Sequence, residues 1–138
     1  MINKINHIGI AVKSLEKSIV FYRDVLKFQY LGSEEVKDQK VTVAMFRVGE
    51  VKIELLEPLS DESPVAKFIE KNGEGIHHIA YQTDDISKEI NHLVSSEIKM
   101  IDETPRKGAH GTEIAFLHPK STGRVLTELC QIKGETHE

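Results

Sequence analysis

The chain has one cysteine, no long apolar run and no excess of basic residues, and each shortage excludes a class of protein. Because Cys130 is the single cysteine among 138 residues, no disulfide can form within the chain, and the expected location is a reducing cytoplasm. No run of 18 apolar residues is present, which excludes a membrane-spanning helix. The chain carries 18 Lys and Arg against 22 Asp and Glu, a net charge of −4 that argues against a nucleic-acid-binding surface.

Several recognisable signals are also missing. The first residues already follow a strand pattern, so no signal peptide is expected. Neither a glycine-rich dinucleotide fingerprint nor a phosphate-binding loop motif occurs. What remains is an ordinary globular composition, 39% hydrophobic and 29% charged, with seven histidines as its one unusual feature. The length suits a single domain with a sizeable core.

The histidines draw attention to an internal repeat near the start of each half of the chain. Residues 6–12 (NHIGIAV) match residues 77–83 (HHIAYQT) at an offset of 71, which places His7 on His78. A helix-like pattern follows both segments at the same offset. Such repetition predicts two copies of one structural module.

A second pair of segments repeats later in each half. Residues 51–56 (VKIELL) match residues 125–130 (VLTELC) at an offset of 74, which places Glu54 on Glu128. Each half therefore carries a histidine and then a glutamate in the same order. The second half has three extra residues between them.

Hydrophobic periodicity and turn residues predict the order β-α-β-β-β in each half. The expected elements of the first half are a strand at 5–12, a helix from Ser14 to about 25, a strand at 28–31 ended by Gly32, a charged loop at 33–40, and a hairpin of strands 41–48 and 51–57 about Gly49-Glu50. Those of the second half are a strand at 76–83, a helix capped by Asp84 or Asp85 that runs to about 95, and strands near Met100, at 113–117 and at 125–132. A linking helix is expected at about 64–71 because Ser63-Pro64 resembles a helix start, and the chain from Gly134 is expected to be a frayed tail.

Side-chain alternation places the four repeated polar residues on one face of their strands. His7, Glu54, His78 and Glu128 each lie in mid-strand with an apolar opposite face. If helices cover the apolar faces, two imidazoles and two carboxylates point inward, and this donor set suits a divalent transition metal with open water positions. The alternative is ordinary: a mid-strand His is often a satisfied core residue, and a mid-strand Glu is often solvated.

Other polar residues have weaker interpretations. His77 alternates to the face opposite His78, so packing or a hydrogen bond is expected, and His137 lies in the tail. The loop at 106–111 (RKGAHG) is either a phosphate or carboxylate clamp that uses backbone N–H groups or a flexible turn. Cys130 is expected to act as a small hydrophobic residue.

The repeat with its two His-Ile segments resembles the vicinal oxygen chelate, or glyoxalase-like, superfamily. Residues 53–59 (IELLEPL), 61–68 (DESPVAKF), 108–111 (GAHG), 116–120 (FLHPK) and 125–129 (VLTEL) are similar, more narrowly, to the methylmalonyl-CoA epimerase family. The resemblance covers about residues 4 to 132. It implies an α+β fold of two βαβββ modules that form a concave mixed sheet with helices on its outer face. The chain would be one domain over 1–138, with repeats at about 4–58 and 75–132 joined by a short helical linker.

The resemblance also implies an activity and its site residues. His7, His78 and Glu128 would be metal ligands with Glu54 in the fourth position, and the ion is expected to be Co²⁺, with Mn²⁺, Ni²⁺ or Zn²⁺ as alternatives. The enzyme would be an isomerase of propionate metabolism that interconverts (2R)- and (2S)-methylmalonyl-CoA. Its expected partners are a small-molecule CoA thioester and a second copy of the chain in a homodimer, without nucleic acid or membrane. The candidate substrate contacts are Lys107, Gly108, Ala109, His110 and Lys120.

Epimerisation requires a base on one face of the substrate carbon and an acid on the other. The C2 proton lies between a thioester and a carboxylate, and its loss gives an enolate that a fixed cation would stabilise. Glu128 and Glu54, or carboxylates that the substrate displaces from the metal, are the expected acid and base. Some members of the family carry a glutamate in the strand equivalent to residues 41–44, but here this stretch (VTVA) has no titratable side chain. Glu113 and His110 are weaker candidates for the second acid or base.

Three other functions fit the same fold. A glyoxalase I-type lyase uses the same metal ligands and the same enolate chemistry, and the SPVAKF and HPK segments favour the epimerase over it. A ring-cleaving dioxygenase uses two His and one Glu on Fe(II), so the second carboxylate at Glu54 counts against it. A metal-free protein that sequesters a ligand belongs to a different class and predicts no turnover.

Overall fold

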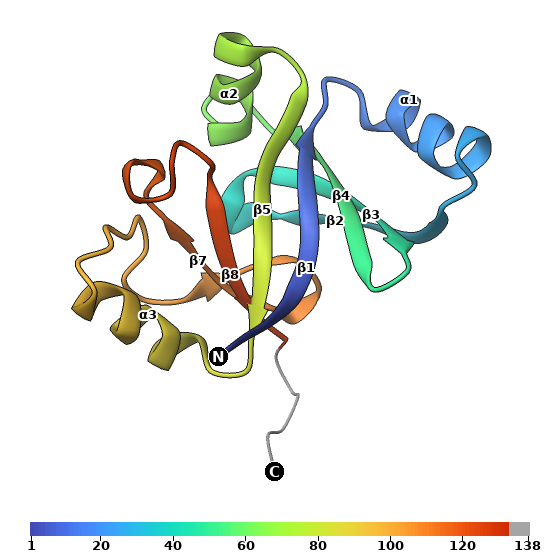
Figure 1. The fold of residues 1–138 in the computed structure, drawn as a ribbon. Helices are drawn as coiled ribbons and strands as arrows, with labels where there is room; N and C mark the ends of the chain where they lie inside the picture. Colours follow the sequence, from blue (N-terminus) through green and yellow to red (C-terminus); the bar gives the residue numbers. More distant parts are fainter. Residues whose placement is uncertain (133–138) are drawn as a thin grey trace. The chain divides into compact units, whose positions relative to one another are not determined.

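The computed structural model describes residues 1–132, in which strands and helices form an α+β fold with a mixed sheet (Figure 1). The strands are β1 (Ile2–Ala11), β2 (Gln29–Val36), β3 (Val41–Val48), β4 (Val51–Pro58), β5 (Gly75–Thr83), β6 (Arg106–Lys107), β7 (Glu113–Leu117) and β8 (Thr127–Gln131). The helices are α1 (Leu15–Val20), which continues as a π-helix (Phe21–Val25), α2 (Pro64–Asn72) and α3 (Ile86–Ser95), and short 3₁₀ turns lie at Lys37–Gln39, Ala109–Gly111 and Pro119–Ser121. The strand order is β2-β3-β4-β1-β5-β8-β7-β6. The predicted fold class, with parallel and antiparallel strand pairs in one sheet, is confirmed.

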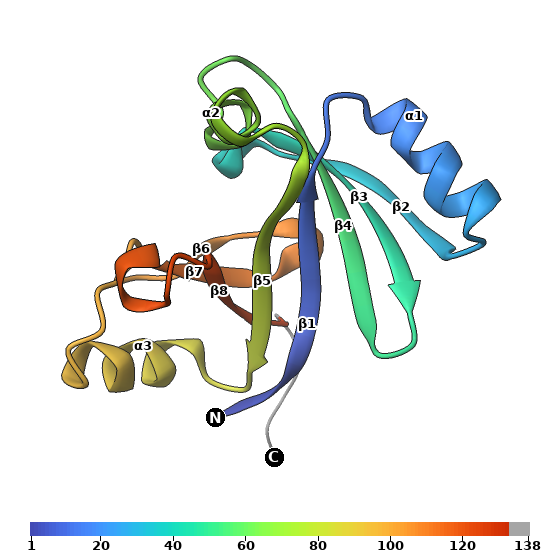
Figure 2. The ribbon, with the colours of Figure 1, turned by 45° about the horizontal axis from the view of Figure 1, so that its top comes forward.

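The chain consists of two compact units, and the boundaries between them fall within strands β1 and β5. One comprises residues 7–77, and the other comprises residues 1–6 with the chain from His78 onward. In the unit of residues 7–77, β1 pairs in parallel with β4, and β4 pairs antiparallel with β3. Helix α1 runs alongside these strands (Figure 2), because its predicted apolar face buries Leu15 and packs Ile19 and Tyr22 against Phe46 and Leu55.

The unit that contains His78 repeats this construction. Strand β5 pairs in parallel with β8, and β8 pairs antiparallel with β7. Helix α3 buries Ile86 and Ile90 in a core with Ala115, Leu117 and Leu129. These five residues follow Leu15, Ile19, Ala44, Phe46 and Leu55 of the other core at the offsets of 71 and 74 seen in the sequence. The three extra residues therefore lie in the connection between β7 and β8, where the first unit has only Gly49-Glu50.

The first unit differs from prediction mainly at strand β2. We predicted that this strand would end at Gly32 and that a charged loop would occupy 33–40, but the strand continues to Val36. The pairing register with β3 shifts between Tyr30 and Gly32, and Gly32 has a φ of 109°. The glycine therefore marks a β-bulge inside the strand, not its end. The predicted helix to about residue 25 is confirmed in extent, although its last five residues are π-helical.

The second unit differs in two short segments. The strand expected near Met100 is reduced to a single bridge between Met100 and Leu117. Next to it, the Phe116 N–H donates to Asp102 Oδ2 at 2.9 Å, so a side chain takes the place of a neighbouring strand. Residues 106–107, predicted as part of a loop, form the two-residue strand β6 beside β7. The last strand spans 127–131 and not 125–132. The predicted tail from Gly134, with His137, lies outside the described residues.

The linking helix begins where the sequence predicts. The Ser63 hydroxyl accepts a hydrogen bond from the Val65 N–H, Pro64 is the first helical residue, and the helix ends at Gly73. Within residues 1–132, no helix is long and apolar enough to cross a membrane.

Candidate metal and catalytic site

A buried histidine and glutamate form a pair in the unit of residues 7–77. Glu54 lies on β4 directly beside Gly9 of β1, and His7 lies two residues before this glycine on the same face. His7 Nδ1 is 3.2 Å from Glu54 Oε2, and each residue is only 5% exposed. Because Gly9 has no side chain, it leaves room for the glutamate to approach the histidine diagonally.

The other unit contains an equivalent pair. Glu128 lies on β8 directly beside Ala80 of β5, and His78 lies two residues before this alanine. His78 Nε2 is 3.2 Å from Glu128 Oε1, and the two residues are 3% and 2% exposed. Phe116, which is paired with Glu128 on β7, contacts the His78 imidazole edge-on with ring centroids 5.6 Å apart. This aromatic contact fixes the plane of the imidazole.

Each pair has the chemistry and spacing of two neighbouring metal ligands. A nitrogen or oxygen ligand lies about 2.0–2.2 Å from a divalent transition metal, so two ligands at a right angle are roughly 3 Å apart. Both pairs have this separation. Imidazole and carboxylate together suit octahedral or open tetrahedral sites of Co, Mn, Ni or Zn. The residues present therefore fit a divalent metal.

Strand β3 supplies apolar neighbours to the first pair. Met45 is paired with Glu54 and Val43 with Leu56, so both side chains lie on the glutamate's face, and both are buried. As the sequence indicates, residues 41–44 offer no titratable side chain, and Arg47 at the far end of the strand is a cation that cannot act as a base. A second acid or base for catalysis must therefore come from elsewhere.

Two residues outside the predicted site behave as the sequence indicated. The His77 ring packs against Phe68 with centroids 5.0 Å apart and an interplanar angle of 79°. Cys130 is 1% exposed and lies in an apolar cluster with Ile114 and Phe116.

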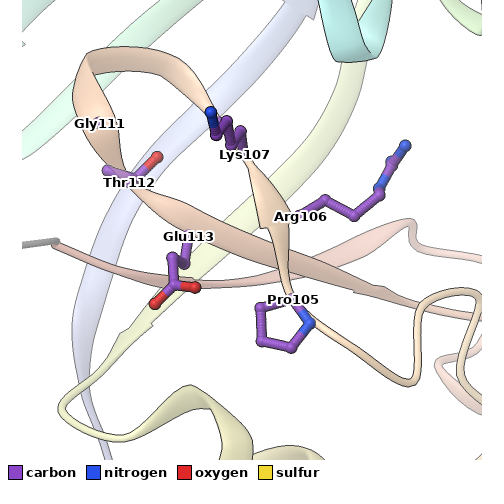
Figure 3. Close-up of a pocket in the computed structure, with 7 residues that line it drawn as sticks. Pro105, Arg106, Lys107, Gly111, Thr112 and Glu113 are labelled. Carbon is purple, nitrogen blue, oxygen red and sulfur yellow. The ribbon is translucent and has the colours of Figure 1, made fainter.

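The predicted substrate loop borders a cavity of about 520 Å³ between β6 and β7 (Figure 3). Lys107 is exposed at its edge, while the neighbouring Arg106 side chain points another way and pairs with Asp102 at 3.1 Å. Glu113 points away from Lys107. Successive strand residues alternate in direction, so Arg106 and Lys107 do not converge on one anion.

The remaining predicted substrate contacts have distinct environments. Gly108 has ordinary extended backbone, but a Cβ there would lie 2.6 Å from Thr112 Oγ1 and 2.7 Å from an Ile114 methyl group. Ala109 is buried, whereas His110 is exposed with a left-handed φ of 54°. Lys120 is exposed in the 3₁₀ turn after β7, where its backbone N–H donates to His118 Nδ1.

The structure contains a buried side-chain hydrogen bond next to His7 that we did not predict from the sequence. The Asn6 side-chain amide donates to Gln82 Oε1 at 2.9 Å, and these residues are 4% and 7% exposed. The sequence indicated this contact only weakly, through one polar residue next to His7 and another on the strand that contains His78. This hydrogen bond pairs a buried N–H of Asn6 on β1 with the buried carbonyl of Gln82 on β5.

Comparison with known proteins identifies the family. Residues 6–116 match the family model described as Glyoxalase/Bleomycin resistance protein/Dioxygenase superfamily. The chain is 47% identical to an uncharacterised protein, YqjC, of Bacillus subtilis over 98% of this chain and 96% of that one. It is 40% identical to an ethylmalonyl-CoA/methylmalonyl-CoA epimerase of Cereibacter sphaeroides over 96% of this chain and all of the relative.

A solved structure gives the same assignment. A methylmalonyl-CoA epimerase in complex with methylmalonyl-CoA and NH₄⁺ superimposes with a TM-score of 0.93 at 36% identity, covering 97% of each chain. Likeness at this level of identity and coverage extends through both units of the chain. The chain therefore belongs to the methylmalonyl-CoA epimerase family, within the glyoxalase superfamily, and is an isomerase.

Proposed function

We propose that this enzyme interconverts the (2R) and (2S) forms of methylmalonyl-CoA. The observation that carries the proposal is the pair of equivalent, buried His–Glu contacts, each with the spacing of adjacent metal ligands. The substrates named for its relatives supply the acyl group and the CoA thioester. An enzyme for this reaction must exchange one proton at C2 and do no other covalent chemistry.

We assign the ligands of one divalent metal to His7, Glu54, His78 and Glu128. All four are buried and offer nitrogen or oxygen ligand atoms. Co²⁺ is the preferred ion, with Mn²⁺, Ni²⁺ and Zn²⁺ as alternatives. When bound, the metal would offset the negative charge that develops on the thioester oxygen as the C2 proton leaves.

The proton transfers are assigned to Glu128 and Glu54. One carboxylate removes the C2 proton, and the C–H electron pair moves into an enolate; the other carboxyl group returns a proton to the opposite face of C2. The two glutamates occupy equivalent places in the two modules, so this assignment takes one carboxyl group from each module. Val43 and Met45 of β3 support this assignment, since these apolar neighbours offer no competing base beside Glu54.

The loop beside β6 is assigned to the CoA portion of the substrate. Lys107 and Lys120 are exposed cations that would bind phosphate groups, and Gly108, Ala109 and His110 lie in the connection from β6 to β7. Each cation would act singly, since Arg106 is directed away from Lys107. We further propose a cytoplasmic homodimer that acts in propionate metabolism, and light scattering should give twice the 15.6 kDa protomer mass.

The decisive experiment joins elemental analysis of the purified enzyme to a deuterium exchange assay. In D₂O the enzyme should exchange the C2 proton of methylmalonyl-CoA at a rate proportional to bound metal. Loss of the methylglyoxal–glutathione adduct, without exchange at C2, would instead identify a glyoxalase I-type lyase. Purification without metal and without turnover of either substrate would identify a ligand-sequestering protein and contradict the proposal.

A further inference from the structure

Two side chains outside the assigned site connect the glutamate strands to the first residue of a helix. Glu57 Oε1 accepts a hydrogen bond from the Leu15 N–H at 2.8 Å, at the start of α1. Gln131 Oε1 accepts one from the Ile86 N–H at 2.9 Å, at the start of α3. The first N–H groups of a helix lack partners within the helix, so each acceptor satisfies a donor that needs one.

The two hydrogen bonds are equivalent in the repeat. The acceptors are 74 residues apart, like Glu54 and Glu128, and the donors are 71 residues apart, like the two histidines. Glu57 and Gln131 each lie three residues beyond a site glutamate. An odd separation in a strand places two side chains on opposite faces. Strands β4 and β8 thus carry a site glutamate on one face and a helix anchor on the other.

The anchors lie where strand pairing ends. The parallel ladder of β1 with β4 finishes with the hydrogen bond from the Val12 N–H to the Leu56 carbonyl, and the Glu57 side chain then binds the next turn of chain. The ladder of β5 with β8 runs through four residue pairs, beginning at Thr127 and finishing at Cys130, before Gln131 binds helix α3. Gln82, before Asp85, pairs with Cys130 of β8, and Ile86, after Asp85, bonds to Gln131. The connection from β5 into helix α3 is thus held to strand β8 at both of its ends.

We infer that Glu57 and Gln131 are positioning residues, which hold β4 and β8 in register so that each glutamate stays beside its histidine. This inference rests on the proposed metal site and deepens it. The shorter β8 depends more on its anchor, so the effect of losing Gln131 exceeds that of losing Glu57. Groups that hydrogen-bond a metal ligand directly change metal affinity by about 10–100-fold when removed. Gln131 acts through the backbone of β8, so we expect the lower end of that range.

The test measures the affinity of purified, metal-stripped protein for Co²⁺ by competition with a chromogenic chelator, together with the midpoint of thermal unfolding without metal. Gln131→Ala should weaken Co²⁺ binding about tenfold, and Glu57→Ala should weaken it by less. In the exchanged variants Gln131→Glu and Glu57→Gln, each position receives the residue that the other module has there, and the acceptor oxygen is kept. These variants should bind Co²⁺ within about twofold of the wild type.

The helix caps provide matched controls. Asp85 caps α3 through the Lys88 N–H, and Ser14 caps α1 through the Lys17 N–H, yet neither bonds to the glutamate strand. Asp85→Ala and Ser14→Ala should therefore lower the unfolding midpoint and leave Co²⁺ affinity unchanged.

The possible outcomes distinguish a failure of this inference from a failure of the proposed metal site. Equal Co²⁺ affinity in Gln131→Ala, Asp85→Ala and wild type would show that the anchors only cap helices, and would overturn the inference while the metal site stands. A wild-type protein that binds no Co²⁺, Mn²⁺, Ni²⁺ or Zn²⁺ would overturn both. If Gln131→Ala does not fold, Gln131→Ser, which retains a polar but shorter side chain, takes its place in the comparison.

Discussion

Small residues beside the two glutamates decide how closely each carboxylate approaches its histidine. Gly9 is the cross-strand neighbour of Glu54, and Ala80, with no exposed surface, is the neighbour of Glu128. A larger side chain at either place would share a strand face with the glutamate and push it away from the imidazole. Both separations are 3.2 Å, and neither neighbouring position carries a side chain larger than a methyl group.

The glutamate of the second module provides the sharpest test of the chemistry. Glu128→Gln keeps the size of the side chain but removes its charge and its ability to take a proton. We expect C2 deuterium exchange to fall by about 10²–10⁴-fold, the usual contribution of an acid or base. Metal content should be measured on the same sample, because normal turnover with metal retained would remove Glu128 from the mechanism.

Gly108 is required for space and not for backbone conformation. A Cβ there would lie 2.6 Å from Thr112 Oγ1, whose hydroxyl donates to the Ala109 carbonyl, and would also meet Ile114. We expect Gly108→Ala to lower the free energy of unfolding by about 1–3 kcal/mol, as overpacking does, measured by urea denaturation. An unchanged urea midpoint would show that the turn yields to an extra methyl group without cost.

At the scale of single elements, helix α2 depends on its cap. Ser63 has no exposed surface, and its hydroxyl accepts the Val65 N–H at 3.2 Å. Ser63→Ala leaves this donor without its acceptor and should cost about 1 kcal/mol of unfolding free energy. Ser60→Ala, at an exposed serine three residues earlier, is the matched control and should change stability by at most about 0.5 kcal/mol. Equal losses in both variants would contradict the cap's contribution.

The elements also show which parts of the fold a sequence can predict. The helices and the hairpin of β3 and β4 followed from periodicity, caps and Gly49, because their apolar faces are buried. Strand β2 did not, because its exposed and charged side chains give no alternating pattern and its glycine bulge resembles a turn. Strand β6 is too short for any periodicity and lies between Pro105 and Gly108.

The candidate site was predictable for a different reason. His7, Glu54, His78 and Glu128 stand out because the repeat places like residues at matching positions, so two weak signals reinforce each other. Glu57 and Gln131 are equally well matched in position and both carry an acceptor oxygen, but such a pair does not by itself predict a metal or catalytic site. Their common task, to offer an oxygen to a helix N–H, becomes visible only when the helix starts are placed beside the strands.

At the scale of the whole molecule, each compact unit contributes one histidine and one glutamate to the proposed site. A metal that takes ligands from both units binds only the fully folded chain, and so stabilises it by mass action. At a free Co²⁺ concentration 100 times the Kd, this stabilisation is about 2.7 kcal/mol. For a chain of 138 residues, such a gain raises Tm by roughly 10 °C.

This coupling is measurable by calorimetry with and without a chelator. Co²⁺ should raise the Tm of the wild type, and chelation should reverse the change. His78→Ala removes a ligand from one unit only, yet it should abolish the metal-dependent shift of the whole chain, since the three ligands that remain would bind Co²⁺ too weakly to stabilise it. If His78→Ala gains as much Tm from Co²⁺ as the wild type does, His78 is not a ligand of the metal, and the assignment of one shared site to these four residues is wrong.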